Sequence, residues 1–224
     1  MGESQDETTK IRQECDMSFE FYKKKLIAVV GPDKVGKFTQ THLLRNNIKS
    51  FGHNVTLVEM PFNDHMTYDL IYAMLKNGTA KTFPNLFQFV QFMNKFLFQK
   101  LELPQLLKEN DFIIFDRWKQ CAVVYGDAGG ANPIFNRWLA NFLIDADYTV
   151  VLEGKSFSRK EETDDVYEKD NSLQSKVAKG YNAWSKLHAS VSSTVDCVGT
   201  KEEVHARIKD ALKRAGVWTG YYKT

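Results

Sequence analysis

The stretch GPDKVGKFTQ, residues 31–40, decides how the rest of this 224-residue chain is interpreted. It ends an apolar run, KKKLIAVVG at residues 23–31, whose β-branched side chains are typical of a strand buried on both faces. A helical pattern begins at Thr39. Because the pattern GxxxxGK stands between a strand and a helix, it predicts a phosphate-binding loop whose backbone N–H groups favour an anion.

The residues of this loop have separate chemical tasks. Lys37 is expected to reach the β- and γ-phosphates of a nucleotide, while the backbone around it wraps the phosphate oxygens. The residues expected to bind the nucleotide are Gly31, Asp33, Lys34, Val35, Gly36, Lys37, Phe38 and Thr39. The pattern usually continues with Ser or Thr, whose hydroxyl helps to hold Mg²⁺, but here the position is Phe38. Thr39 lies about 100° further round the helix and does not simply replace that hydroxyl.

Predicted strands and helices alternate along the whole chain. The strands are expected at residues 23–31, 53–59, 112–115, 148–152 and 194–198. The helices are expected at residues 39–50, 68–75, 86–107, 134–144, 173–189 and 201–215. This alternation predicts an α/β fold with a five-stranded parallel sheet and helices on both faces. We expect a polar N-terminal extension at residues 1–22 and one domain at residues 23–224, with a short charged lid at about residues 154–170.

Composition and charge exclude several classes of protein. Apolar residues make up 43% of the chain and charged residues 26%, which argues against a disordered chain. The net charge of +2 argues against nucleic-acid binding driven by bulk charge. No apolar run reaches the roughly twenty residues of a membrane span, so no membrane partner is expected. The widely spaced cysteines Cys15, Cys121 and Cys197 favour a reduced, cytoplasmic location.

Several segments, in order along the chain, resemble the signature of the thymidylate kinase family. Residues 31–40 resemble its loop, GxDxxGK followed by Ser or Thr and then TQ, and Pro61 resembles the proline of its FPxR segment. The pair Asn94-Lys95 resembles its helical NR pair, and Asp116-Arg117-Trp118 its DRY motif. Residues 164–181, DDVYEKDNSLQSKVAKGY, resemble the segment that follows its lid. The resemblance covers most of the chain and implies a P-loop NTPase fold of the nucleoside monophosphate kinase type.

The resemblance also implies an activity and a set of site residues. It implies transfer of the γ-phosphate of ATP, with Mg²⁺, to a deoxynucleoside monophosphate: thymidylate, or a close or modified pyrimidine analogue. Carried over by position, the catalytic residues would be Lys37, Asp116, Arg117 and Arg159 of the lid, with Asp116 organising Mg²⁺ and Gly199 and Thr200 bordering the adenine. Those implied for the acceptor are Asp33, Pro61, Phe92, Lys95, Arg117, Cys121, Tyr125 and Tyr167. A homodimer is implied as well.

The predicted helix at residues 86–107 has two faces. The core stripe is expected to contain Leu86, Phe89, Val90, Met93, Leu97 and Leu101. The opposite face carries Gln88, Gln91, Phe92, Lys95 and Gln99. A ring, amides and a cation would suit a base pocket, with Phe92 stacking on the base and Lys95 at an exocyclic oxygen. Without a gap, however, Gln91 takes the family's Phe position, and a solvated polar face with an isolated Phe is the other interpretation.

Three positions depart from the family pattern. Phe38 replaces a hydroxyl residue, while Asn63 and Lys95 each stand where the family has an arginine. Lysine does not bind a phosphate or carboxylate bidentately, so these changes suggest a shifted substrate. Two alternatives therefore stay open. The protein could phosphorylate another nucleoside monophosphate or a nucleoside, or it could bind a nucleotide without catalysis. The lid around Arg159 could equally be an ordinary solvated loop.

Overall fold

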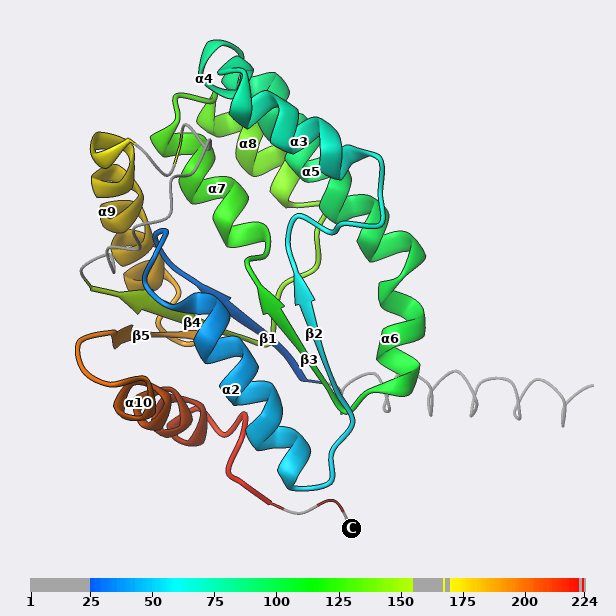
Figure 1. The fold of residues 1–224 in the computed structure, drawn as a ribbon, viewed down its shortest axis with the longest axis vertical. Helices are drawn as coiled ribbons and strands as arrows, with labels where there is room; N and C mark the ends of the chain where they lie inside the picture. The colour runs from blue at the N-terminus through cyan, green and yellow to red at the C-terminus, as the bar shows by residue number, and fades with distance from the viewer. Residues whose placement is uncertain (1–24, 155–166, 168–169, 222, 224) are drawn as a thin grey trace, which may run out of the picture.

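A five-stranded parallel sheet forms the centre of the fold, which confirms the predicted α/β architecture (Figure 1). The strands lie in the order β2-β3-β1-β4-β5. Their bounds are β1 Lys25–Val30, β2 Val55–Glu59, β3 Phe112–Asp116, β4 Tyr148–Glu153 and β5 Ser192–Asp196. β1 pairs with both β3 and β4, so the loop that follows β1 leaves the sheet beside the end of β3. In that register Asp116 is the partner of Val29, and Glu59 is the partner of Asp116.

The computed structural model describes residues 25–154, 167, 170–221 and 223. The predicted N-terminal extension lies outside the described residues, and so does most of the predicted lid, including Arg159. None of the described helices combines the length and the apolar character needed to cross a membrane.

Helices cover both faces of the sheet (Figure 1). Their bounds are α2 Lys37–Ser50, α3 Thr67–Lys76, α4 Thr79–Thr82, α5 Pro84–Leu101, α6 Leu103–Glu109, α7 Lys119–Ala128, α8 Pro133–Ala140, α9 Asn171–Leu187 and α10 Lys201–Arg214. Side chains alternate across a strand, so β1 contributes Ile27 and Val29 to one core, with α2 and α10. Leu26, Ala28 and Val30 enter the other core, with helices α3 to α9. This explains why β1 is a continuous apolar run.

The connections before and after β3 each differ from the prediction in one place. The single helix predicted at residues 86–107 is two helices, because α5 ends at Leu101 and α6 begins at Leu103. Pro104 lies in the first turn of α6, where its missing N–H has no intrahelical acceptor to lose. Helix α7 follows β3 directly and was not predicted. It packs against α5, α8 and α9, and Gly126 permits the contact with α8, since a Cβ there would lie 2.2 Å from Asn136 Nδ2.

The two faces of α5 also differ from the prediction. Leu86, Phe89 and Leu101 of the expected core stripe are exposed, whereas Val90 is buried as expected. The buried residues of α5 are Phe87, Gln88, Val90, Phe92, Asn94, Lys95 and Phe98. Phenylalanines occur on opposite sides of the helix, so the apolar pattern alone did not identify the face that packs. In this orientation the amides of Gln88 and Asn94 and the ammonium group of Lys95 are buried.

Gly31 is required where β1 passes into the loop. Its φ is +151°, and a Cβ would lie 2.4 Å from the carbonyl oxygen of Leu152 on β4. We predict that Gly31→Ala lowers the free energy of unfolding by more than about 2 kcal/mol, because strain and a backbone clash add. Gly78→Ala is the matched control: φ is +80°, no atom lies within 4 Å, and a loss of about 1 kcal/mol is expected. Equal losses in urea denaturation would contradict the clash with Leu152.

Candidate active site

The loop between β1 and α2 wraps back on itself around Lys37. Gly36 and Lys34 have φ of 89° and 63°, a left-handed conformation that turns the chain sharply. The Lys37 side chain is 5% exposed, and its Nζ donates a hydrogen bond to the carbonyl oxygen of Pro32 at 2.5 Å. The same ammonium lies 3.6 Å from Asp33 Oδ1. Burial lowers the pKa of Lys37, and the nearby charge of Arg117 lowers it further.

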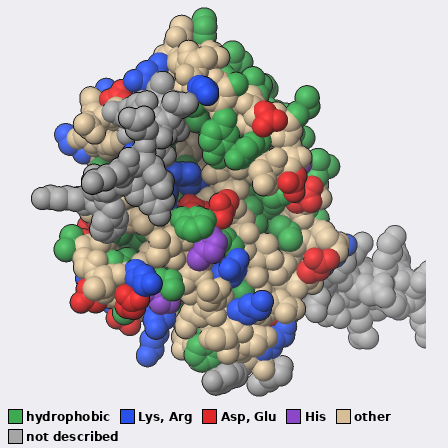
Figure 2. Space-filling model, in the orientation of Figure 1, with side chains coloured by type: hydrophobic (Ala, Val, Ile, Leu, Met, Phe, Trp, Pro, Cys, Tyr) green, Lys and Arg blue, Asp and Glu red, His purple; other side chains and the backbone are tan. Residues whose placement is uncertain are grey.

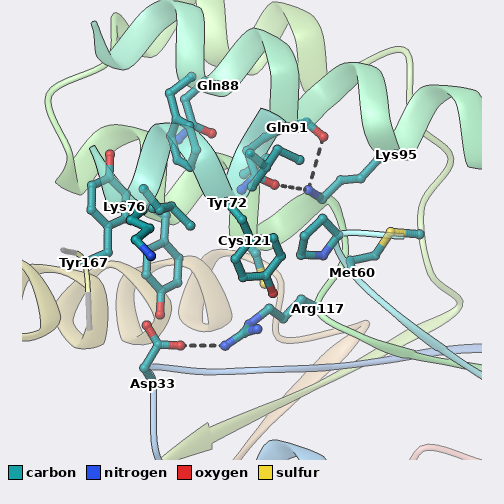
Figure 3. Close-up of a pocket in the computed structure, with 16 residues that line it drawn as sticks. Asp33, Met60, Tyr72, Lys76, Gln88, Gln91, Lys95, Arg117, Cys121 and Tyr167 are labelled. Atoms are coloured by element: carbon teal, nitrogen blue, oxygen red, sulfur yellow. Dashed lines mark hydrogen bonds and ion pairs between the residues drawn. The ribbon is translucent and has the colours of Figure 1, made fainter. Parts of the chain in front are cut away.

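Asp33 connects this loop to two other parts of the chain, of which Figure 3 shows the link to Arg117. Arg117 Nη2 donates to Asp33 Oδ1 at 2.7 Å, and Gln174 Nε2 of α9 donates to Asp33 Oδ2 at 2.9 Å. The Asp33 N–H in turn donates to Gln174 Oε1 at 3.0 Å. Burial alone would raise the pKa of Asp33, but the charges of Arg117 and Lys37 outweigh it and lower the pKa to about 2. Asp33 is therefore a carboxylate at neutral pH.

The segment Asp116-Arg117-Trp118 forms a strained turn at the end of β3. Arg117 has a φ of 68°, which is unfavourable for a residue with a side chain, and its N–H donates to Val29 O at 3.1 Å. Trp118 stacks on Phe115 with ring centroids 4.3 Å apart and anchors the turn in the core. The turn directs Arg117 toward Asp33. Burial raises the pKa of Asp116, and its Oδ1 is buried without a hydrogen-bond partner among the described residues.

A cavity of about 310 Å³ opens beside this turn, within the size range of small-molecule sites (Figure 3). The predicted acceptor residues that line it are Asp33, Pro61, Lys95, Arg117, Cys121, Tyr125 and Tyr167. The further lining residues are Met60, Ile71, Tyr72, Leu75, Lys76, Phe87, Gln88, Gln91 and Ala122. Of these, Gln88 and Gln91 belong to the polar helix face predicted to suit a base pocket. Several belong to α3, whose amphipathic pattern does not reveal which side of it meets a cavity. Arg159 lies outside the described residues.

Phe92 does not line this cavity. It is 8% exposed and packs against other rings, with centroids 5.4 Å from Phe96, 6.3 Å from Phe142 and 6.4 Å from Phe89. Its predicted place as a stacking surface in the pocket is therefore wrong, because a shift of one residue rotates a side chain by about 100° around the helix. Gln91 lines the cavity instead, as the ungapped alignment with the family placed it.

The pair Asn94-Lys95 combines a structural residue with a cavity residue. Asn94 is fully buried and holds the loop after Pro61, accepting from Phe62 N at 2.7 Å and donating to Phe62 O at 2.9 Å. Lys95 is 3% exposed, and its Nζ donates to Gln91 Oε1 at 3.0 Å (Figure 3). Burial lowers the pKa of Lys95 to about 8, with a smaller contribution from the charge of Arg117.

The structure also places Phe38 and Thr200, two further residues predicted to bind the nucleotide. The Phe38 side chain is 55% exposed and packs on the ring of His42, with centroids 4.1 Å apart. It is therefore not part of the core. Thr200 caps α10, since its hydroxyl accepts from Glu203 N at 3.2 Å. Gly199 precedes this cap with a φ of +119°, so both residues predicted to border the adenine belong to the exposed turn between β5 and α10.

Comparisons with known proteins agree on one family. A sequence profile described as thymidylate kinase matches residues 29–208. The chain is 28% identical over 131 residues to the thymidylate kinase of African swine fever virus isolate Tick/South Africa/Pretoriuskop Pr4/1996, covering 58% of this chain and 52% of the viral protein. For isolate Warthog/Namibia/Wart80/1980 the identity is 30% over 106 residues, covering 47% and 43%. The matches thus span about half of each viral protein or less.

Solved structures show the same fold. Thymidylate kinase from Candida albicans superimposes with a TM-score of 0.70 and 21% identity, over 87% of this chain and 93% of that one. Thymidylate kinase from Ehrlichia chaffeensis gives a TM-score of 0.65 and 19% identity, over 84% and 98%.

The low pKa of Asp33 predicts a pH-dependent contribution to stability. A carboxylate whose pKa is lower in the folded protein stabilises it above its unfolded pKa of 3.8, and this contribution is lost as the pH falls toward 2. Arg117 is about one-third exposed, so we expect at most about 2 kcal/mol. The difference in unfolding free energy between wild type and Asp33→Asn should therefore shrink between pH 5 and pH 2. A difference that stayed constant in denaturant titrations would contradict this assignment.

Proposed function

The chain belongs to the thymidylate kinase family, and we propose that it transfers the γ-phosphate of ATP to thymidylate or a closely related pyrimidine deoxynucleoside monophosphate. One observation supports this most strongly. Asp33 belongs to the phosphate-binding loop and also lines the cavity, where it is paired with Arg117. A donor phosphate in the loop and an acceptor in the cavity would therefore meet at this ion pair, at the edge where parallel α/β sheets bind ligands.

The described residues suit phosphoryl transfer because that reaction depends on positioning and on charge neutralisation. Lys37 would neutralise the donor phosphates. Arg117 would bind the acceptor phosphate with its planar group of N–H donors, while Asp33 orients it from the loop side. Tyr125 would lie against the deoxyribose and Lys95 at an oxygen of the base, since both line the cavity. Asn63 is exposed and carries no charge, so Arg117 is the main cation proposed for the acceptor phosphate.

The residues present fit a magnesium ion held chiefly by phosphates and water. Asp116 offers a buried carboxylate oxygen without a hydrogen-bond partner, and oxygen is the ligand that Mg²⁺ prefers. Within the described part of the chain, no group of three His, Cys, Asp or Glu residues could hold a metal ion. Mg²⁺ commonly uses only one or two protein carboxylates, so Asp116 is the residue proposed to hold it. The ion would neutralise charge on the ATP phosphates.

The primary experiment measures ADP formation by Lys37→Met with ATP, Mg²⁺ and thymidylate. We expect the turnover number to fall by roughly 10²- to 10³-fold, because the variant removes a charge from the donor phosphates. Lys49→Met, at the exposed end of the same helix, should keep the wild-type rate. Equal rates for the two variants would contradict the role of Lys37. Thymidylate-dependent ADP formation by the wild type separates a kinase from a protein that only binds nucleotides.

Phe38→Thr tests how the missing hydroxyl at this position affects the use of Mg²⁺. Because Phe38 is exposed, the variant should fold normally. The new hydroxyl would stand where related loops place a magnesium ligand, so the Mg²⁺ concentration for half-maximal rate should fall or stay unchanged. A magnesium titration of both forms measures this. A large loss of rate in a folded variant would show that the Phe38 ring itself serves catalysis.

We also propose that the protein forms a homodimer through an apolar surface on α5 and the end of α8. Phe89, Trp138 and Phe142 are all more than 40% exposed, and ring contacts through Phe92 join them into one patch. Figure 2 shows hydrophobic side chains gathered along one edge of the molecule, over the α3 and α5 region. Large exposed apolar patches commonly mark interfaces.

The proposed interface predicts that a charged substitution within it lowers the mass of the protein in solution. Phe89→Glu should convert a dimer to a monomer in sedimentation experiments, because it places a charge within the interface. Val198→Glu in the turn after the edge strand β5, which is 62% exposed and lies away from α5 and α8 (Figure 1), should leave the mass unchanged. A wild-type monomer at high protein concentration would overturn the proposal.

A further inference from the structure

His42 lies one turn after Phe38 on α2, beside the phosphate-binding loop. Its ring packs on that of Phe38, with centroids 4.1 Å apart, and its Nδ1 lies 2.9 Å from the carbonyl oxygen of Phe38. A carbonyl oxygen only accepts hydrogen bonds, so Nδ1 carries the proton, and in the neutral imidazole Nε2 keeps the lone pair. A histidine that binds a metal through one ring nitrogen usually donates the other N–H in this way.

Asp116 points toward the face of the sheet that α2 covers (Figure 1). Side chains alternate along a strand, and Ile114, two residues earlier on β3, belongs to the same core as Leu44 and Ile48 of α2. Asp116 is 8% exposed, and its Oδ1 has no hydrogen-bond partner among the described residues. Burial raises the pKa of Asp116, and neighbouring positive charges, that of His42 among them, oppose this rise. An imidazole and an unpartnered carboxylate therefore stand near each other beside the loop.

The loop lacks the hydroxyl that usually helps to hold the metal, because that position is Phe38. Thr41 does not supply one, since its hydroxyl is bonded within the helix, 3.1 Å from Lys37 O and 2.9 Å from Phe38 O. We propose that His42 takes over the task of the missing hydroxyl and binds the divalent cation of the nucleotide through Nε2, beside Asp116. This inference rests on the proposed function, because the loop must hold the phosphates that bring the cation.

A nitrogen ligand defines the class of ion that suits the site. Imidazole is a better ligand for transition-metal ions than for Mg²⁺, which favours oxygen. In the described part of the chain the side chains do not form a complete metal site, so the phosphates of the nucleotide and water would supply the remaining ligands. The class inferred is therefore a divalent ion that accepts both imidazole nitrogen and phosphate oxygen, and Mn²⁺ serves as the probe.

The test measures binding of Mn²⁺ to the full chain in the presence of ADP, for wild type, His42→Asn and His188→Asn. Asparagine can still donate to the carbonyl of Phe38, but it has no ring nitrogen. Electron spin echo spectra of Mn²⁺ bound to wild type should show modulation by an imidazole nitrogen. Isotopic labelling of histidine should shift this modulation, which distinguishes it from an adenine nitrogen. His42→Asn should abolish the modulation and raise the dissociation constant for Mn²⁺ roughly 10- to 100-fold. His188→Asn, at the exposed end of α9, should behave as wild type.

A second readout restores the hydroxyl. If His42 replaces that group, His42→Asn should raise the dissociation constant for Mn²⁺ less in a Phe38→Thr background than in the wild-type background, because the two ligands substitute for each other. An equal rise in both backgrounds would overturn the inference.

Further outcomes separate this inference from a structural role and from the proposed function. Bound Mn²⁺ without imidazole modulation in wild type would overturn it, and so would the absence of Mn²⁺ binding with ADP. If His42→Asn weakened ADP binding equally with and without Mn²⁺, the role of His42 would be structural and the inference would fall. If the Mn²⁺ results are as expected but wild type forms no ADP from ATP and thymidylate, the inference about His42 stands and the proposed kinase activity falls.

Discussion

The ion pair between Asp33 and Arg117 is the contact on which the arrangement of the site depends. It joins the loop after β1 to the turn after β3, two segments that are far apart in sequence but leave adjacent strands. The strained backbone of Arg117 is held in place by a hydrogen bond to β1 and by the stacking of Trp118 on Phe115. The rigid sheet therefore fixes the distance between the region proposed for the donor phosphates and the cavity proposed for the acceptor.

Helix α5 shows how a polar cavity is built within an apolar layer. Its buried Asn94 forms hydrogen bonds with the loop after Pro61, whereas Gln88 and Lys95 line the cavity. Burial of an ammonium group is unfavourable, and the pKa of Lys95 falls to about 8 as a result. Ionisable groups with shifted pKa values cluster at functional sites. The cavity thus combines polar side chains with apolar ones in its lining.

Local patterns in the sequence predicted the sheet, the loop and most helices, because apolar β-branched runs and a glycine-lysine loop have few other structural solutions. Helix α7 was missed since its small residues, such as Ala122 and Gly126, gain their stability from three neighbouring helices rather than from an amphipathic pattern. The faces of α5 were assigned wrongly because aromatic side chains lie on opposite sides of it. The contribution of Tyr72 and Lys76 depends on how α3 docks on α5, which only tertiary structure determines.

The two cores on opposite faces of the sheet have an evolutionary consequence. Most of the cavity residues come from the layer that contains α3, α5 and α7, while α2 and α10 pack in a separate core with Ile27 and Val29. Substitutions in one layer are shielded from the other by the strands between them. This division allows the chemistry of one ligand pocket to change during evolution while the opposite layer keeps the chain folded. Substrate specificity can therefore diverge faster than the fold.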